Sequence, residues 1–358
     1  KDMSLANEWE GFHKVTEIFK EYDSGIETKN DRFVLAYSRE ALERVVDDLC
    51  GMAIDDVKKK YGLTDGVWTV QAARDALAGF DKRHVQTVQY RPFDFRWTFL
   101  HDKAGFLARP RRKVSQYFDA DGRNNVGLCF TRTAGGDGYK NVFASDRPID
   151  AHITSGQDYL APLWIYKDGK REANFTDGFA VFLASLPFAP APEDVFAYIY
   201  SVLHSPAYRA KYAEFLKSSF PAVPVTRNED VFTRYAELGH QLIDLHLLRH
   251  VPPDGLNISM DGVSGDFELK KIERKGDALL LTTDEGSIIT ITGISDEVWN
   301  FEIGSHRPIE RWLKYRIRDG AVLSPGQDLT HIGRIVAAVS GTIEVMNDLG
   351  DLEELWRR

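Results

Sequence analysis

Residues 87–166 constrain the fold most, because they favour extended strands while the segments on either side repeat with helical spacing. The run begins with closely spaced aromatic and β-favouring side chains such as Tyr90 and Trp97. Residues 134–138, which are rich in glycine, are typical of a flexible loop or a hairpin tip. The middle of the chain is therefore predicted to be β-rich. Strands are expected at residues 87–100, 126–131, 141–144 and 159–166.

Outside this region, apolar residues recur every three or four positions, as on one face of a helix. Ser38, Ser205 and Asn228 precede three of these runs and are expected to cap helices, because their side-chain oxygens accept backbone N–H groups. A short strand is expected at residues 32–37 and a hairpin at residues 278–292. Helices are expected at residues 5–19, 38–49, 55–61, 69–80, 195–203, 205–216, 228–248, 308–313 and 324–346.

These elements predict a mixed α+β chain with a β-rich central domain. Pro252-Pro253-Asp254-Gly255 breaks the chain before its last strands and marks the clearest boundary. The expected division is an N-terminal helical connector (1–82), a central domain (83–250) with a β-rich part (83–186) and a helical part (187–250), and a small C-terminal α+β unit (251–358).

The composition is that of an ordinary globular chain, with 43% hydrophobic and 28% charged residues. No apolar run approaches the ~18 residues of a membrane span, and no signal peptide is visible. Cys50 and Cys129 lie in apolar runs and are expected to be buried, reduced thiols, which favours a cytoplasmic location. The chain begins with Lys1 instead of Met, as a piece of a longer protein would.

The formal net charge is −9, but the charge is segregated along the chain. Residues 82–140 hold twelve Lys or Arg against five Asp or Glu, whereas residues 20–81 hold nine against thirteen. A local excess of cations is the pattern that a phosphate-binding surface needs. The cations expected to neutralise phosphates are Arg91, Arg96, Arg109, Arg111, Arg112 and Lys113.

The glycine-rich loop is the candidate for sequence discrimination. Arg132, Lys140 and Arg147 flank it, and residues 132–140 are expected to approach base edges in a DNA groove. A solvated surface explains the same cations, and a plain hairpin tip explains the same loop, so both alternatives stay open.

Common catalytic signatures are missing. The sequence has no P-loop, no G-x-G-x-x-G, no H-E-x-x-H, no paired C-x-x-C, no G-x-S-x-G and no adenine-methyltransferase tetrapeptide. No cofactor or metal is therefore expected in this chain. One alternative is a Mg²⁺-dependent nuclease, because Asp254, Glu268 and Lys270 imitate a PD…E-x-K arrangement. A turn at Asp254 and a charged strand face explain the same residues.

A second weak constellation is Asp146, Asp150 and His152, whose side chains are suited to metal binding or acid–base chemistry. Asp146 precedes Arg147-Pro148 and is equally typical of a turn, across which His152 would hydrogen bond. The turn is the favoured interpretation, and polar contact with DNA is the next.

Several motifs, in order over about 300 residues, resemble the C-terminal target-recognition region of Type ISP and related single-chain restriction-modification enzymes. They are Ser24-Gly25-Ile26-Glu27-Thr28-Lys29-Asn30-Asp31; Tyr90-Arg91-Pro92-Phe93-Asp94-Phe95-Arg96-Trp97 with Arg109-Pro110-Arg111; Asn125-Val126-Gly127-Leu128 with Ser145-Asp146, Asp150 and His152; Tyr198-Ile199-Tyr200-Ser201-Val202-Leu203-His204-Ser205-Pro206 with Phe215-Leu216-Lys217 and Phe220-Pro221; and Val298-Trp299 with Ile303-Gly304 and Trp312-Leu313-Lys314-Tyr315-Arg316.

The resemblance implies that residues 83–250 are a target-recognition domain for double-stranded DNA. It also implies a methyltransferase module, in the same or a partner chain, into which the target adenine would be flipped. S-adenosylmethionine, ATP and Mg²⁺ would then act only in modules upstream of this chain, which itself would be non-catalytic. Two other classes stay open: the nuclease described above and a protein-coupling module that contacts no DNA.

Overall fold

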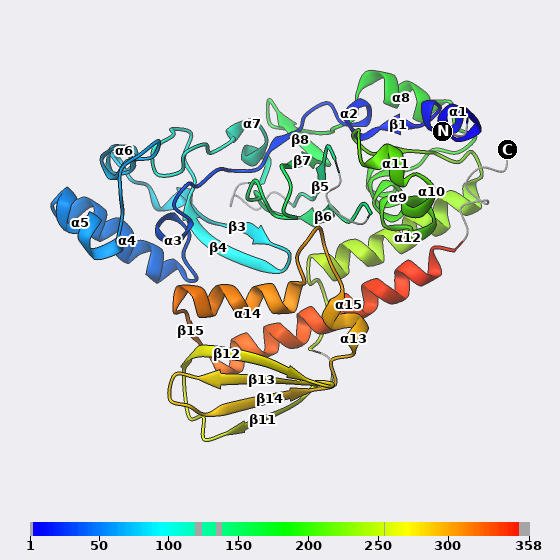
Figure 1. Ribbon diagram of the computed structural model, residues 1–358. Helices are drawn as coiled ribbons and strands as arrows, with labels where there is room; N and C mark the ends of the chain where they lie inside the picture. The colour runs from blue at the N-terminus through cyan, green and yellow to red at the C-terminus, as the bar shows by residue number, and fades with distance from the viewer. Residues whose placement is uncertain (1–2, 119–123, 134–137, 254, 351–358) are drawn as a thin grey trace.

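At the centre of the fold is a four-stranded antiparallel sheet in the order β2–β7–β5–β6 (Figure 1). Leu128 and Phe130 of β5 pack into one hydrophobic cluster with α9 and α12, whereas Cys129 faces a second cluster that includes the C-terminal helices. The sheet is thus buried on both faces, because alternate side chains of a strand point to opposite sides. The strands are β2 (Asp23–Ser24), β5 (Gly127–Thr131), β6 (Val142–Ser145) and β7 (Asp158–Pro162).

The structure is a computed structural model that describes residues 3–118, 124–133, 138–253 and 255–350. It confirms the mixed α+β class. No helix among these residues is long and apolar enough to cross a membrane.

The N-terminal third contributes short helices and a twisted hairpin (Figure 1). Most buried apolar residues between Ile26 and Leu107 pack into a cluster of their own, whereas Trp9, Val15 and Ile18 join the cluster of α9 and α12. Its helices are α1 (Met3–Glu10), α2 (Val15–Ile18), α3 (Asp31–Val34), α4 (Arg39–Gly51), α5 (Ile54–Tyr61), α6 (Val70–Ala76) and, past the hairpin, α7 (Arg112–Ser115). The hairpin joins β3 (Val85–Arg91) to β4 (Asp94–Phe99), with a 3₁₀ turn before it at Lys82–His84 and another after it at Gln116–Phe118.

Two expectations for this third are wrong. The expected helix over residues 5–19 is split, because β1 (His13–Lys14) leaves helical geometry to pair with β10 (Ala222–Val223). The expected strand at residues 32–37 is largely the one-turn helix α3, followed by a single bridge between Ala36 and Trp97. The first deviation comes from long-range pairing, which overrides local propensity. The second is local, because the Val34 N–H donates to the Asn30 carbonyl at 3.0 Å and closes the helical turn.

Two helices beside the central sheet, α10 and α12, begin where the sequence predicts, whereas α8 was not predicted and α9 begins three residues before its expected start. The Ser205 hydroxyl accepts the Tyr208 N–H at 3.2 Å, with proline at the first position of α10. The Asn228 side chain accepts the Val231 N–H at 3.1 Å at the start of α12. This part of the chain contains β8 (Trp164–Lys167), β9 (Lys170–Ala173), α8 (Asp177–Ala184), α9 (Pro192–His204), α10 (Pro206–Lys211), α11 (Ala213–Leu216) and α12 (Glu229–His246).

The C-terminal part is a five-stranded antiparallel sheet in the order β11–β14–β13–β12–β15, with α14 and α15 between it and the rest of the molecule (Figure 1). Leu279, Leu281 and Ile289 face Trp312 and Ile335 in one core. Its elements are β11 (Asn257–Asp261), β12 (Phe267–Lys275), β13 (Ala278–Thr283), β14 (Ile288–Thr292), α13 (Asp296–Asn300), α14 (Pro308–Asp319), β15 (Val322–Leu323), a π-helical turn (Pro325–Leu329) and α15 (Thr330–Asp348).

The domain boundaries stay a prediction. Hydrophobic contacts cross the one at residue 82, because Trp68 and Val88 share a cluster. Contacts also cross the one at residue 250, since the Arg334 guanidinium donates to the Leu248 carbonyl and α15 packs on α12. Of the two thiols, Cys129 is buried as expected, whereas Cys50 is exposed, contrary to the expectation.

Candidate nucleic-acid interface

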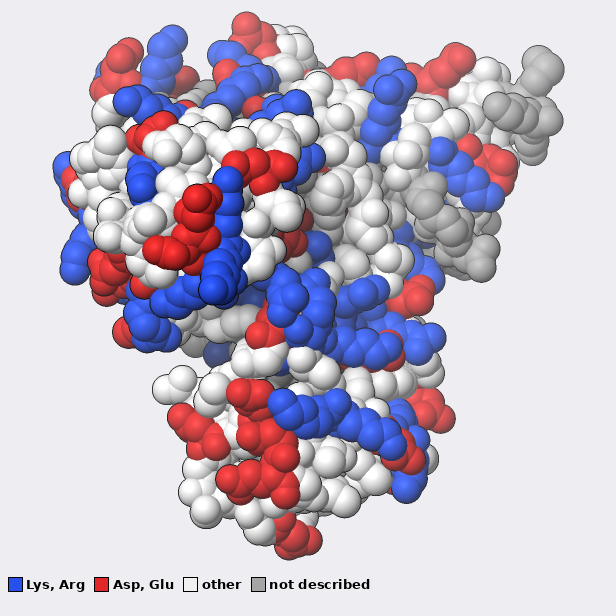
Figure 2. Space-filling model, turned by 60° about the vertical axis from the view of Figure 1, so that its left-hand side comes forward, with Lys and Arg blue, Asp and Glu red and all other residues white. Residues whose placement is uncertain are grey.

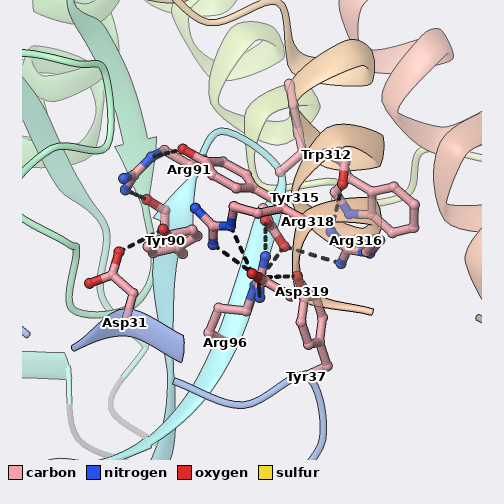
Figure 3. Close-up of polar contacts among 12 residues, drawn as sticks. Asp31, Tyr37, Tyr90, Arg91, Arg96, Trp312, Tyr315, Arg316, Arg318 and Asp319 are labelled. Atoms are coloured by element: carbon pink, nitrogen blue, oxygen red, sulfur yellow. Dashed lines mark hydrogen bonds and ion pairs between the residues drawn. The ribbon is translucent and has the colours of Figure 1, made fainter. Parts of the chain in front are cut away.

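Arg96 lies in the interior, where it joins the β3–β4 hairpin to α14 (Figure 3). Its guanidinium donates to both carboxylate oxygens of Asp94, at 2.8 and 3.1 Å, and is stacked 3.6 Å from the ring of Tyr37. Arg316, from α14, reaches the same carboxylate at 3.1 Å. Because the Arg96 side chain is only 3% exposed, it has no path to a DNA phosphate. This corrects its expected role.

The Asp94 carboxylate binds both arginines as an ion. Burial alone would raise its pKa, but the charges of Arg316 and Arg96 and their hydrogen bonds hold the pKa at about 2. Asp319 completes the network, accepting a hydrogen bond from the Tyr37 hydroxyl at 2.8 Å. The arrangement fixes the hairpin against α14.

Arg91 is also largely enclosed. Its Nη1 lies 2.7 Å from Asp150 Oδ1, its Nε donates to the Tyr315 hydroxyl at 3.2 Å, and its guanidinium lies 4.0 Å from the ring centre of Tyr90 (Figure 3). Its side chain is 11% exposed. The structure therefore gives Arg91 a buried carboxylate as its partner, which corrects the expected phosphate contact.

The other four predicted phosphate contacts lie at the surface around α7, but each is paired with a carboxylate. Arg109 and Arg111 share Glu27, at 3.0 and 2.9 Å. Arg112 pairs with Asp102 at 2.7 Å and Lys113 with Glu21 at 3.3 Å. The structure thus brings these cations together, with most of their charge compensated by Glu21, Asp23, Glu27 and Asp102.

Glu27 is the centre of this patch. Burial raises its pKa, but the hydrogen bond from Arg111 and the charges of Arg109, Arg111 and Lys29 outweigh burial, so the pKa lies below its ordinary value. Glu27 also forms a backbone bridge with Arg109, which fixes the two segments in register. The carboxylate therefore belongs to the fold and stays charged at neutral pH.

The loop between β5 and β6 is held at its second end. Lys140 Nζ lies 2.8 Å from Glu302 Oε2, and the Lys140 carbonyl accepts the Gly304 N–H at 2.8 Å. Arg132 is exposed on the first side of the loop. Residues 134–137, the expected tip, lie outside the described residues. Arg147 is separate from the loop ends, pairing with Asp146 at 2.8 Å and stacking on Phe95 at 4.1 Å.

Asp146, Asp150 and His152 do not form a catalytic cluster. Asp146 pairs with Arg147, and Asp150 is buried with Arg91 while accepting the His152 backbone N–H at 2.9 Å. The His152 ring contacts the Gly156 carbonyl across a turn at 2.7 Å. The chain does bend at Asp146 and Arg147, where the Ser145 hydroxyl accepts the Arg147 N–H at 3.2 Å, but His152 does not bond across that bend as expected.

The nuclease alternative gains no support. Asp254 lies outside the described residues, while Lys270 pairs with Glu268 at 2.9 Å on an exposed strand face. Within the described ranges, no group of three or more His, Cys, Asp or Glu side chains is placed to hold a metal ion.

A cationic stripe on α14 was not among the predicted contacts. Arg307 precedes the helix, and the other three members follow at steps of four, three and four residues, so that all four lie along one face. Glu310 is the carboxylate nearest the stripe, 2.6 Å from Lys314 and 3.9 Å from Arg307. The α14 stripe consists of Arg307, Arg311, Lys314 and Arg318.

Figure 2 shows Lys and Arg gathered in a band across the waist of the molecule, at the level of α14 and above the C-terminal sheet. At one end of the band, a cleft of about 1000 Å³ opens between α3 and α4 on one side and the end of α14 on the other. Arg318 lines it from α14, and Arg32 and Arg44 line it from the opposite wall. The waist is therefore both hollowed and cationic.

Residues 17–347 match the model of the family described as the Type ISP C-terminal specificity domain. The chain belongs to this family. No curated protein matches it in sequence.

Solved structures show the same fold for this Type ISP specificity domain. A DrdV–DNA complex matches with a TM-score of 0.71 and 21% identity, covering 96% of this chain and 38% of that one. The ATP-dependent Type ISP restriction-modification enzyme LlaBIII bound to DNA matches at 0.71 and 18%, covering 96% and 24%. A nuclease-deletion mutant of the Type ISP enzyme LlaGI with a DNA substrate mimic matches at 0.69 and 20%, covering 96% and 34%. This chain thus spans a quarter to two fifths of those proteins.

The sequence of this Type ISP specificity domain did contain a signal for the α14 stripe. Proline at the first position predicted the helix, and cations at steps of four, three and four residues on its exposed face were visible without any structure. The stripe was not predicted, because the expected helix ended at residue 313, before Lys314 and Arg318, and because cations are densest along the chain between residues 82 and 140.

Proposed function

We propose that this specificity domain recognises a sequence in double-stranded DNA on behalf of a restriction-modification enzyme and performs no catalytic step itself. The observation that carries the proposal is the family match over residues 17–347. The cationic waist supports it, because phosphate contacts supply much of the affinity of a DNA-binding protein. DNA complexes of three proteins with this fold support it further.

In this proposal, contacts to phosphates and contacts to bases have different roles. Surface cations hold the duplex through its phosphates, which fixes the register and carries no sequence information. The β5–β6 loop, flanked by Arg132 and Lys140, approaches the base edges and discriminates between sequences. Arg109, Arg111, Arg112, Lys113 and Arg147 stay secondary candidates, since each is already paired with a carboxylate.

The chemistry of the parent enzyme belongs to other modules. A methyltransferase module, in the same or a partner chain, would bind S-adenosylmethionine and modify the target base, with this domain setting the register. ATP and Mg²⁺ would likewise act outside this chain, in the cytoplasm. The nuclease and protein-coupling alternatives have no observation in their favour.

The test is a selection from a pool of duplexes with a randomised central segment. Three rounds of binding to the immobilised chain at 0.1 M salt should enrich one short motif, and a duplex carrying it should bind more tightly than one with the motif scrambled. A pool that stays random after selection would refute sequence recognition. Incubation of plasmid with the chain and Mg²⁺ should leave the plasmid supercoiled.

A further inference from the structure

The two cationic surfaces of the domain differ in how far nearby carboxylates compensate their positive charge. Around α7, the four predicted cations face four carboxylates within ion-pair distance. On the α14 stripe, Glu310 is shared by two cations, and Arg311 has no carboxylate partner among the described residues. In the described part of the chain, the one carboxylate that pairs with Arg318 is Asp319, which Arg32 and Arg96 also contact. Uncompensated positive charge is therefore concentrated on α14.

The α14 stripe is long enough to contact several phosphates of a DNA duplex. Eleven residues separate Arg307 from Arg318, so the stripe is about 16 Å long at 1.5 Å per residue. A duplex presents one phosphate per ~1.7 Å of its axis, counting both strands, so this length faces several phosphates. Trp312 and Leu313 bury the opposite face of the helix in the C-terminal core, which holds the stripe rigid.

The β5–β6 loop ends beside the start of this helix. The Gly304 N–H donates to the Lys140 carbonyl, and Lys140 pairs with Glu302, which lies six residues before the first residue of α14, Pro308. Gly304 has φ of +61°, and a Cβ there would lie 1.7 Å from the Thr154 carbonyl oxygen. Only glycine fits this close approach, which fixes the loop end relative to α14.

We propose that α14 lies along the phosphate backbone of a DNA duplex, with its four-cation stripe in contact with phosphates. The inference rests on the proposed function and adds the surface that performs it. It replaces the α7 patch, on which the sequence placed the phosphate contacts.

The first experiment removes charge from each surface in turn. Binding of a fluorescent 30-base-pair duplex of mixed sequence is measured by anisotropy between 20 and 300 mM KCl for the wild-type chain, Arg311→Gln/Lys314→Gln and Arg109→Gln/Arg112→Gln. Loss of two phosphate contacts should weaken binding roughly 10- to 30-fold at 0.15 M salt and reduce the salt slope by about 1.8. The matched α7 variant should change affinity less than about threefold.

The second experiment adds charge, so that misfolding cannot imitate the expected result. Glu310→Gln removes the carboxylate within the stripe and should tighten binding of the same duplex about threefold or more, with a steeper salt slope. Glu214→Gln is the control, because Glu214 also pairs with an exposed lysine at 2.8 Å but lies on α11, away from α14. It should leave affinity unchanged.

The outcomes separate this inference from the proposed function. A wild-type chain that binds no duplex at 20 mM KCl would overturn both. Wild-type binding that the α14 variants leave unchanged, or equal losses from the α14 and α7 variants, would overturn the assignment to α14 alone. A duplex selected for tight binding should lose affinity by the same factor as the mixed one, since phosphate contacts carry no sequence information.

Discussion

Replacement of Asp94 by Asn tests whether the buried arginine network is structural. Asp94 is 1% exposed and is the carboxylate that contacts both Arg96 and Arg316. Its pKa of about 2, against an ordinary 3.8, corresponds to a net stabilisation of the carboxylate on the order of 2 kcal/mol at neutral pH. Asn keeps the shape of the side chain but removes the negative charge that compensates the two buried guanidiniums. We therefore expect the free energy of unfolding to fall by about 3–5 kcal/mol in total.

The assay is urea unfolding followed by tryptophan fluorescence, with Trp312 stacked 3.3 Å from the Arg316 guanidinium as an internal reporter. Since the pKa of Asp94 is lowered by folding, its contribution is complete above pH 3.8 and is lost as the pH falls towards 2. The gap between wild type and variant should thus be constant from pH 5 to pH 8. Asp102→Asn, which breaks an ion pair of a 76% exposed carboxylate, should cost less than about 0.5 kcal/mol.

Two results would refute this reasoning. One is a loss below about 1 kcal/mol, which would mean that the arginines are hydrated or compensated elsewhere. The other is an unchanged stability together with a large loss of DNA affinity, which would return Arg96 to the DNA-binding role that the sequence suggested.

Three further predictions concern stability. Burial raises the pKa of Asp158 to about 7, so the free-energy cost of ionising it in the folded state grows as the pH rises from 3.8 through 7. The unfolding free energy of Asp158→Asn, measured in urea, should therefore rise by roughly 2 kcal/mol relative to that of the wild type as the pH goes from 5 to 8. Gly239→Ala should cost about 3 kcal/mol, because its Cβ would lie 1.9 Å from the Ala197 carbonyl oxygen between α12 and α9, whereas Gly178→Ala, in open space, should be neutral or stabilising by thermal denaturation. Ser205→Ala should lower the unfolding free energy by about 1 kcal/mol through loss of the cap of α10, and Ser205→Gly by only a few tenths.

Local signals in the sequence predicted most of the regular elements. Ser205, Pro206 and Asn228 placed helix starts to the residue, because capping depends only on groups within one turn. The split of the first helix was not predictable in this way, since it depends on pairing of His13 with Val223, 210 residues later. Tertiary pairing decides such short segments.

The buried role of Arg96 was partly visible in the sequence. Asp94 and Arg96 are two residues apart on a predicted strand, so their side chains emerge on the same face and are placed to pair. The burial of that pair depends on Arg316, which comes from a helix 222 positions away. Sequence spacing therefore indicated the pair, but only the fold excludes it from the surface.

The segregation of charge along the chain has a different meaning in three dimensions. The acidic stretch before residue 82 contributes Glu21, Asp23 and Glu27, and these carboxylates lie against the cations of Arg109–Lys113 because β2 adds to the edge of the central sheet and residue 27 bridges residue 109. Two oppositely charged segments thus neutralise each other when folded. A surface that attracts DNA has to hold cations in excess of its spatial neighbours, and the α14 stripe meets that condition with fewer cations than the segment the sequence favoured.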